Sequence, residues 1–186
     1  MEFIVKKNEE ITDEILDKVL EFDRTIFPED EDYAFPDGYF RDLYKNNKEG
    51  MFVLVDNLNN VYGYVNLIFI SKKGKDEFLK NREYLKLEHI GFKKGKNIVY
   101  LYNLLIHESL RNGIYIIMIM KEICKWLYEE KENGKIIDYI FSEAVTEDGV
   151  KTLMAMEMSP LDIDDEKMGI YYSKDNLGKY ILKMIN

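Results

Sequence analysis

The feature that most constrains the fold is an almost continuously apolar run at residues Ile98–Ile106. A run of this length without polar alternation is typical of a central strand that is covered on both faces. A helical pattern follows from about Gly113 to Lys131, and a second β-rich run follows at Ile136–Val145. Strand, long helix and strand in this order predict two parallel strands joined by a right-handed crossover. The sequence therefore predicts an α/β fold.

The remaining elements predict antiparallel pairing around this parallel unit. Turn-forming residues between Asp56 and Asn60 separate two β-rich runs, which indicates a hairpin. Thr12 stands where the N-cap of an amphipathic helix is expected, and Pro28 ends that helix. Further strands are expected at Phe3–Lys6, Met51–Val55, Val61–Ile70, Pro160–Ile163 and Ile170–Ser173, and further helices at Asp37–Asn46 and Glu147–Met158. The predicted fold class is a mixed, mostly antiparallel central sheet with helices on both faces.

The chain of 186 residues is expected to form one domain over residues 1–186, because no linker rich in Pro, Gly or Ser divides it. A basic insertion at about residues 71–97 stands out, since its Lys and Arg residues outnumber its Asp and Glu residues. We interpret this insertion as a solvated helix with flanking loops. Its apolar residues are expected to face the domain from one helix: Phe78, Leu79, Leu85 and Ile90.

Charge and composition argue against several classes of function. The formal net charge of -9 opposes binding to polyanions, so no nucleic-acid partner is expected. No apolar window approaches the roughly 18 residues of a membrane span, so no membrane partner is expected either. Cys124 is the single cysteine, and His89 and His107 lack a zinc-binding spacing. We therefore expect no metal and a reducing, cytoplasmic location.

Short stretches in a fixed order along the chain resemble segments of a known family. Val61–Val65 reads Val-Tyr-Gly-Tyr-Val, and Leu104–His107 is followed by the Arg-Asn-Gly-Ile segment Arg111–Ile114. Ser142–Val145 and then Glu147–Lys151 follow later. These stretches resemble the third strand, the fourth strand with its cofactor loop, and the fifth strand with its helix in the GNAT superfamily of N-acetyltransferases, the last in an uncharacterised bacterial branch. The resemblance implies the GNAT fold and transfer of an acetyl group from acetyl-CoA.

The chemistry of acetyl-CoA indicates where its site lies. The molecule carries a pyrophosphate and an amide-rich pantetheine arm, so it requires unpaired N–H groups at a helix start and at a strand edge. The turn before the long helix is placed to supply the first, and the strand ending at His107 the second. An amide at that strand end also stabilises the oxyanion formed by amine attack. The expected cofactor-binding residues are Leu105, Ile106, His107, Arg111, Asn112, Gly113, Ile114 and Tyr115.

The chain departs from the family pattern at two places. The family loop is (Gln/Arg)-x-x-Gly-x-(Gly/Ala), and Arg111 and Gly113 fit its first two fixed positions only if one residue is deleted between them, which tightens the loop. Tyr115 then stands where the family has a small residue. Many family members use a Tyr in the helix after the fifth strand to protonate the CoA thiolate, and Leu153 stands at that position here. A thiolate is already a tolerable leaving group, so water is an alternative proton source.

Two residues are candidates for catalysis. Glu143 is the first candidate for the general base, because strand alternation places it at the open end of an apolar face with Ile137, Tyr139 and Phe141. The alternative is a hydrogen-bonded Glu at a strand end. Tyr102 on the central strand is the second candidate, with a core aromatic as the alternative. His107 is considered as a base or as a phosphate partner, against a hydrogen-bonded histidine at a strand end.

The resemblance implies a primary amine as acceptor, on a small molecule or a peptide. An acidic loop between the first two helices would attract a cationic acceptor, but we favour a solvated loop because such loops are common in acidic proteins: Glu29, Asp30, Glu31, Asp32 and Asp37. A homodimer is left open beside a monomer. Two classes of function remain, an N-acetyltransferase and a catalytically degenerate GNAT-fold domain that senses CoA or binds a protein.

Overall fold

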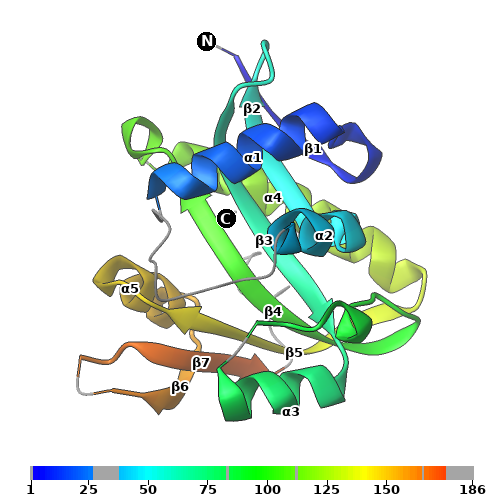
Figure 1. The fold of residues 1–186 in the computed structure, drawn as a ribbon, viewed down its shortest axis with the longest axis vertical. Helices are drawn as coiled ribbons and strands as arrows, with labels where there is room; N and C mark the ends of the chain where they lie inside the picture. Colours follow the sequence, from blue (N-terminus) through cyan, green and yellow to red (C-terminus); the bar gives the residue numbers. More distant parts are fainter. Residues whose placement is uncertain (1, 27–37, 83, 112, 165, 175–186) are drawn as a thin grey trace.

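The computed structural model describes residues 2–26, 38–82, 84–111, 113–164 and 166–174. Within these residues seven strands form one sheet in the order β1-β2-β3-β4-β5-β7-β6 (Figure 1). The strands are β1 (Phe3–Lys7), β2 (Met51–Asp56), β3 (Val61–Ile70), β4 (Gly95–Ile106), β5 (Lys135–Ala144), β6 (Ser159–Ile163) and β7 (Gly169–Lys174). The α-helices are α1 (Asp13–Ile26), α2 (Tyr39–Asn46), α3 (Lys72–Asn81), α4 (Ile114–Glu132) and α5 (Glu147–Ala155). Short 3-10 turns lie at Asn8–Glu10, Lys48–Gly50, Leu87–His89 and Glu108–Leu110.

The sheet is mixed, with one parallel pair. β4 and β5 run parallel and are connected through α4. The other neighbouring strands pair antiparallel, including the hairpin formed by β6 and β7. The predicted fold class is thus confirmed, and most predicted element bounds differ from the observed ones by a few residues at most. The second helix begins at Tyr39, and the acidic loop predicted to precede it lies outside the described residues.

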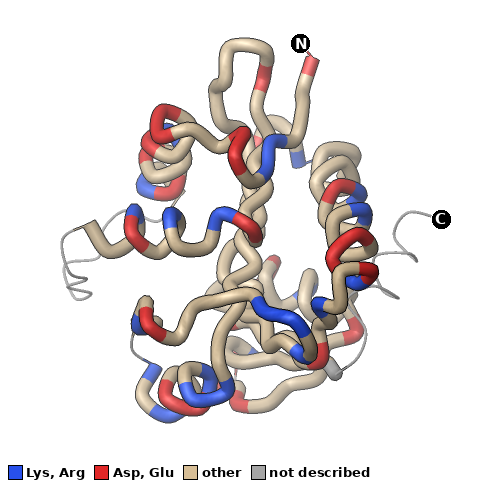
Figure 2. The backbone as a smooth tube through the Cα atoms, turned by 90° about the vertical axis from the view of Figure 1, so that its right-hand side faces the viewer, with Lys and Arg blue, Asp and Glu red and all other residues tan. Residues whose placement is uncertain are grey.

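Two apolar cores lie on the two faces of the sheet, and Figure 2 shows the helices on either side of it. On one face α4 and α5 cover residues such as Phe52, Leu101 and Ile140. On the other face α1, α2 and α3 cover residues such as Val53 and Tyr100. This arrangement explains why β2 and the Ile98–Leu101 stretch of β4 are apolar on both faces. No helix in the described ranges combines the length and apolar character needed to cross a membrane.

Side-chain caps fix the starts of two helices that flank the candidate site. The Thr12 hydroxyl accepts a hydrogen bond from the Ile15 amide at 3.3 Å, which confirms the predicted start of α1. The Thr146 hydroxyl accepts one from the Gly149 amide at 3.1 Å at the start of α5. α4 instead begins after Gly113, which has φ +86° and no side chain that caps the helix.

The basic insertion differs from its prediction in one respect. Its helix, α3, ends at Asn81, where Arg82 takes a left-handed conformation with φ 57°. Phe78 packs into the core from α3, but Leu85 does so from the segment that follows. Ile90 forms an isolated antiparallel bridge with Ile70 of β3. The expectation that all its apolar residues lie on one helix is therefore wrong, because the chain reverses at Arg82.

Candidate cofactor and acceptor site

The candidate site begins where β4 and β5 part. The parallel ladder runs from Gly95 paired with Lys135 to Leu101 paired with Ser142 and ends there. At this last pair the Ser142 hydroxyl donates a 2.7 Å hydrogen bond to the Leu101 carbonyl. β4 continues to Ile106, and no strand among the described residues pairs with it on this side, so its edge beyond Leu101 faces the gap between the two strands.

The register between β3 and β4 decides which groups of β4 point into this gap. Asn103 pairs with Asn66, but Leu101 pairs with Leu67, so Tyr102 is one extra residue that forms a β-bulge. Beyond the strand the His107 amide donates to the Tyr62 carbonyl at 2.7 Å.

Because hydrogen-bonded and non-hydrogen-bonded pairs alternate in an antiparallel ladder, the backbone of Leu105 faces Tyr64. The amides of Leu104 and Ile106 then face the gap. Of the strand residues predicted to bind the cofactor, only Ile106 presents its amide to this edge. Leu104 lies there too, although the prediction did not include it.

Gly63 allows this end of β4 to lie close to β3. A Cβ atom at Gly63 would stand 2.7 Å from the Leu105 carbonyl oxygen and 2.6 Å from Cδ1 of Ile106. Both distances are shorter than any ordinary contact, and a backbone oxygen has no rotamer by which to withdraw. The glycine in the Val-Tyr-Gly-Tyr-Val stretch is therefore required by the close approach of the two strands.

Some backbone amides of the loop between β4 and α4 are bonded to carbonyl groups of the same loop. The Leu110 amide donates to the His107 carbonyl at 2.9 Å, and the Arg111 amide donates to the Glu108 carbonyl at 3.2 Å. The Arg111 side chain turns back, and its Nε donates to the Ile106 carbonyl at 3.3 Å. Asn112, a predicted cofactor residue, lies outside the described residues. The amides of Leu110 and Arg111 are thus committed within the loop.

The start of α4 supplies the remaining backbone donors. The first N–H groups of a helix have no acceptor within it, and α4 has no side-chain cap. The amides of Tyr115 and Ile116 therefore point out of its N-terminus, toward which the helix dipole attracts anions. The Tyr115 ring packs edge-on against Phe3 with ring centroids 4.9 Å apart, which fixes the first turn against β1.

Glu143 lies on β5, one residue beyond Ser142, where the pairing of β4 with β5 ends, and an arginine binds its carboxylate. The Arg82 Nη1 donates to the Glu143 Oε1 at 3.0 Å, and the Arg82 Nη2 donates to the Asp162 Oδ2 at 2.5 Å. The expected face is only partly correct. Phe141 packs in the core on the same side of the sheet, but Ile137 packs on the opposite side because an irregularity at Asp138 changes the alternation.

Tyr102 lies at the bulge, with its ring centroid 5.4 Å from that of Tyr100. Burial raises the pKa of Tyr102 well above its ordinary value, so the hydroxyl keeps its proton at neutral pH. In this state it can donate a proton or a hydrogen bond but cannot act as a base. Burial also raises the pKa of Tyr100, with a smaller contribution from the charge of Glu143.

A polar cluster beside the bulge was not predicted from the sequence. Asp23 of α1, Tyr44 of α2, Tyr64 of β3 and Asn103 of β4 meet between the helices and the sheet. The Tyr64 hydroxyl donates to Asp23 Oδ1 at 2.5 Å, and the hydroxyls of Tyr44 and Tyr64 lie 3.2 Å apart. Asn103 Nδ2 contacts all three partners, at 3.4 Å from Asp23 and 3.3 Å from Tyr44.

The charge of Asp23 is poorly compensated. Burial raises its pKa, although the Tyr64 hydrogen bond and the charge of Arg24 partly oppose this effect. The sequence did hold a signal for this residue. Asp23 follows Leu16 and Val19 on the buried stripe of α1, where an apolar residue is expected. A charged residue on such a stripe indicates a specific partner or a function.

His107 lies near the same cluster. Its ring stacks over Phe22 with centroids 6.4 Å apart and meets Tyr62 edge-on at 5.9 Å. Its Nδ1 lies 2.8 Å from the Ser109 hydroxyl. The histidine therefore stands where β4 ends, between the α4 loop and the cluster around Asp23.

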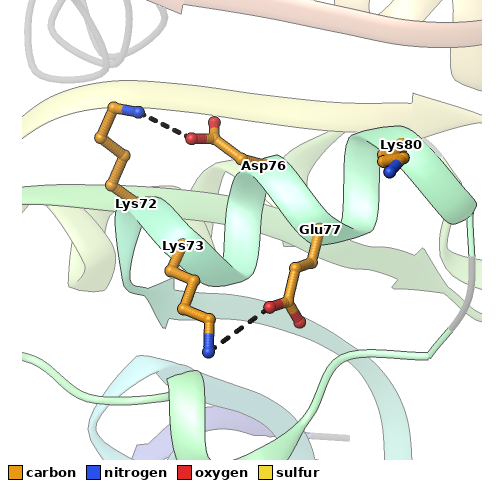
Figure 3. A pocket seen from close by; sticks show the side chains of 5 residues that line it. All are labelled: Lys72, Lys73, Asp76, Glu77 and Lys80. Carbon is orange, nitrogen blue, oxygen red and sulfur yellow. Dashed lines mark hydrogen bonds and ion pairs between the residues drawn. The ribbon is translucent and has the colours of Figure 1, made fainter.

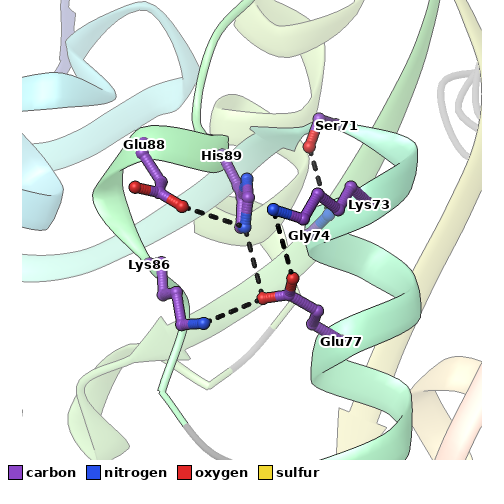
Figure 4. A network of polar contacts seen from close by, with 7 residues as sticks. All are labelled: Ser71, Lys73, Gly74, Glu77, Lys86, Glu88 and His89. Atoms are coloured by element: carbon purple, nitrogen blue, oxygen red, sulfur yellow. Dashed lines mark hydrogen bonds and ion pairs between the residues drawn. The ribbon is translucent and has the colours of Figure 1, made fainter.

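A separate surface hollow lies on the outer side of α3 (Figure 3). Its lining residues all come from that helix, and ion pairs join Lys72 to Asp76 at 2.7 Å and Lys73 to Glu77 at 3.6 Å. Figure 4 shows Glu77 also contacting Lys86 at 3.1 Å and His89 at 3.3 Å. These contacts join α3 to the segment that follows it within the basic insertion. Across the described residues no group of three His, Cys, Asp or Glu side chains is arranged to hold a metal ion.

Comparisons with known proteins agree with this geometry. No protein-family model matches the sequence, and no curated protein matches it. Solved structures do match. Arabidopsis thaliana NAA60 in complex with acetyl-CoA has a TM-score of 0.56 at 14% identity over 92% of this chain and 97% of that one. The mosquito protein arylalkylamine N-acetyltransferase like 5b has a TM-score of 0.58 at 10% identity, over 93% of this chain and 100% of that one.

A GNAT-family acetyltransferase from Staphylococcus aureus has a TM-score of 0.51 at 12% identity, over 93% of this chain and 99% of that one. Sequence identity this low carries information about the fold alone. The chain therefore has the GNAT fold, as its sequence predicted.

Proposed function

We propose that the protein is an N-acetyltransferase that moves the acetyl group of acetyl-CoA to a primary amine. The observation that carries this proposal is the edge of β4 beyond Leu101, which no strand of the described residues covers. A pantetheine arm has the amide spacing of an extended peptide and adds to such an edge as a strand does. The likeness in fold to an acetyl-CoA complex supports the same assignment.

The described residues fit acetyl-CoA at three points. The gap-facing amides of Leu104 and Ile106 match the carbonyl groups of the pantetheine arm. The first turn of α4 offers amides to the pyrophosphate. The close packing at Gly63 holds the end of β4 in place, so these donors are preorganised.

The reaction follows from these positions. The nitrogen of a neutral amine attacks the thioester carbonyl carbon, and a backbone amide of β4 that faces the gap stabilises the negative oxygen that forms. The C–S bond then breaks, and its electron pair leaves with sulfur. The attacking nitrogen loses one proton and the departing thiolate takes up one, and water or the neutral Tyr102 hydroxyl can pass the proton between them.

Calorimetry with acetyl-CoA, followed by release of free CoA thiol in the presence of primary amines, tests the proposal. We expect micromolar affinity for acetyl-CoA and amine-dependent thiol release. The proposal is contradicted if the protein binds no acetyl-CoA at concentrations up to about 1 mM. A dissociation constant of that size corresponds to a binding free energy on the order of −4 kcal/mol.

A domain that binds CoA without turnover is the second candidate function, and two observations favour it. Leu153, at the position of the family's acid, lies in the core at 4% exposure and reaches no substrate. The amides of Leu110 and Arg111 are already bonded within the tight loop. Acetyl-CoA binding without thiol release for any amine supports this second candidate.

A further inference from the structure

We propose that Asp23 binds the ammonium group of the acceptor and takes its first proton. This inference rests on the proposed function and names the residue that selects the acceptor. It follows from the geometry of the cluster formed by Asp23, Tyr44, Tyr64 and Asn103, defined here as the α1–β4 cluster.

The carboxylate of Asp23 has one committed and one available oxygen. Its Oδ1 accepts hydrogen bonds from the Tyr64 hydroxyl and from Asn103 Nδ2. Within the described residues no donor lies within hydrogen-bond distance of Oδ2, and no Lys, Arg or His forms an ion pair with Asp23. The residue is only half-buried, so a ligand can reach it. A partly desolvated carboxylate without a paired cation favours the binding of a ligand that carries a positive charge.

The α1–β4 cluster lies beside the expected position of the thioester. Asn103 of the cluster directly precedes Leu104, whose amide faces the gap between β4 and β5. Its side chain reaches Asp23 at 3.4 Å on the face covered by α1 and α2. An amine that bonds to Asp23 is therefore one side-chain length from the β4 edge, where the thioester carbonyl is expected.

Aromatic rings surround the same carboxylate. Phe22 packs edge-on against Tyr64 at 6.4 Å, and Tyr44 packs against Tyr64 at 6.2 Å. Tyr44 and Tyr64 are fully buried and Phe22 is 8% exposed, so these rings keep water from one side of the carboxylate. The ligand class that fits the half-buried carboxylate is a primary ammonium, from a small amine or from the end of a peptide.

The proton balance follows directly. The ammonium form of the amine gives one proton to the Asp23 carboxylate and becomes the neutral amine that attacks the thioester carbon. A second proton passes from the amine nitrogen to the departing thiolate. Asp23 then returns its proton to solvent, so that one proton is released for each amide formed. The titratable or charged groups around Asp23 are Arg24 of α1, Tyr44, Tyr64, Tyr102 and, beside Phe22, His107.

The test compares Asp23→Asn with Glu21→Gln, which removes one charge from the exposed side of the same helix. Phenethylamine, its neutral analogue 2-phenylethanol and a tetrapeptide with a free amino terminus are titrated into the protein saturated with CoA. We expect the wild type to bind phenethylamine, the tetrapeptide or both, and to bind 2-phenylethanol at least tenfold more weakly than phenethylamine. Asp23→Asn lowers the ammonium affinity at least tenfold and leaves acetyl-CoA affinity unchanged, and Glu21→Gln changes neither.

Turnover gives a second readout. Asp23→Asn lowers kcat/KM for the amine at least tenfold and removes the fall in kcat/KM that protonation of Asp23 causes on the acidic side of the pH profile. Equal binding of the amine and the alcohol by the wild type overturns the inference, even if the variant fails to fold. Unchanged amine affinity in Asp23→Asn, or a wild type that binds neither ammonium probe, also overturns it. Absence of acetyl-CoA binding in the wild type overturns the proposed function instead.

Discussion

Replacing Gly63 with Ala should displace β4 and so disturb the candidate cofactor site on its other edge. The new Cβ would lie 2.7 Å from the Leu105 carbonyl oxygen and 2.6 Å from Cδ1 of Ile106. The side-chain atom can move aside, but the backbone oxygen moves only if β4 moves. β4 carries the gap-facing amides of Leu104 and Ile106, so a shift of this strand changes the position of the donors that the pantetheine arm requires.

The expected magnitude follows from overpacking. Inserting one carbon into a closely packed site costs about 1–3 kcal/mol of the free energy of unfolding. For a chain of 186 residues this lowers the melting temperature by about 2–4 °C for each kcal/mol. Loss of strand alignment should weaken acetyl-CoA binding at least tenfold, which is about 1.4 kcal/mol.

Gly91 provides the matched control. A Cβ at Gly91 meets no atom within 4 Å, and its backbone does not require a glycine. Gly91→Ala should therefore stabilise the protein by about 0.4–1 kcal/mol through the unfolded state and leave acetyl-CoA affinity unchanged. Urea unfolding and calorimetry measure both variants. Equal stability and equal acetyl-CoA affinity for the two variants would refute the reasoning about Gly63.

Three further predictions concern charged groups. Because burial raises the pKa of Asp23, the folded state disfavours its ionised form. Asp23→Asn should therefore be more stable than the wild type at pH 7, and this difference should shrink as the pH falls through the folded pKa toward 3.8; thermal unfolding at several pH values decides this, and a constant difference contradicts it. Arg82→Ala removes the ion pairs of Arg82 with Glu143 and Asp162, which are partly exposed, and should lower the free energy of unfolding in urea by less than about 1 kcal/mol. A loss of several kcal/mol would show that the pairs are structural. Burial raises the pKa of Cys124 to about 11, so only about one thiol in a thousand is ionised at pH 8 and a thiol reagent should label it slowly in the native state; rapid labelling would contradict its burial.

Much of the fold was predictable because its signals are local. The apolar run in β4, the Thr12 cap and the amphipathic α1 each depend on neighbouring residues, and each was confirmed. The prediction that β4 and β5 are parallel required only the order of the elements and the rule that such crossover connections are right-handed. Pairing partners followed from the hairpin turn between β2 and β3.

Irregularities of one residue were not predictable in the same way. The bulge at Tyr102 and the irregularity at Asp138 change which way every later side chain or amide points. Strand alternation counted from the sequence therefore placed Ile137 on the wrong face. Such shifts depend on contacts between strands that are distant in sequence.

The sequence indicated the backbone segment of the candidate site, the end of β4 and the loop after it, but did not indicate the α1–β4 cluster of side chains beside it. The loop between β4 and α4 is contiguous in sequence, so its resemblance to a cofactor loop was readable. The α1–β4 cluster draws single residues from four elements that lie up to 80 positions apart. Only the charge at Asp23 on a buried stripe marked it, and its partners needed the tertiary structure.

The proposed function requires that the pantetheine arm of acetyl-CoA pairs with the open edge of β4, and backbone amide NMR during a titration with acetyl-CoA tests this pairing. We expect the amides of Leu104 and Ile106 to shift and become protected from hydrogen exchange, while the amide of Leu105, already paired with β3, changes little. Saturable binding that leaves Leu104 and Ile106 unprotected would contradict it.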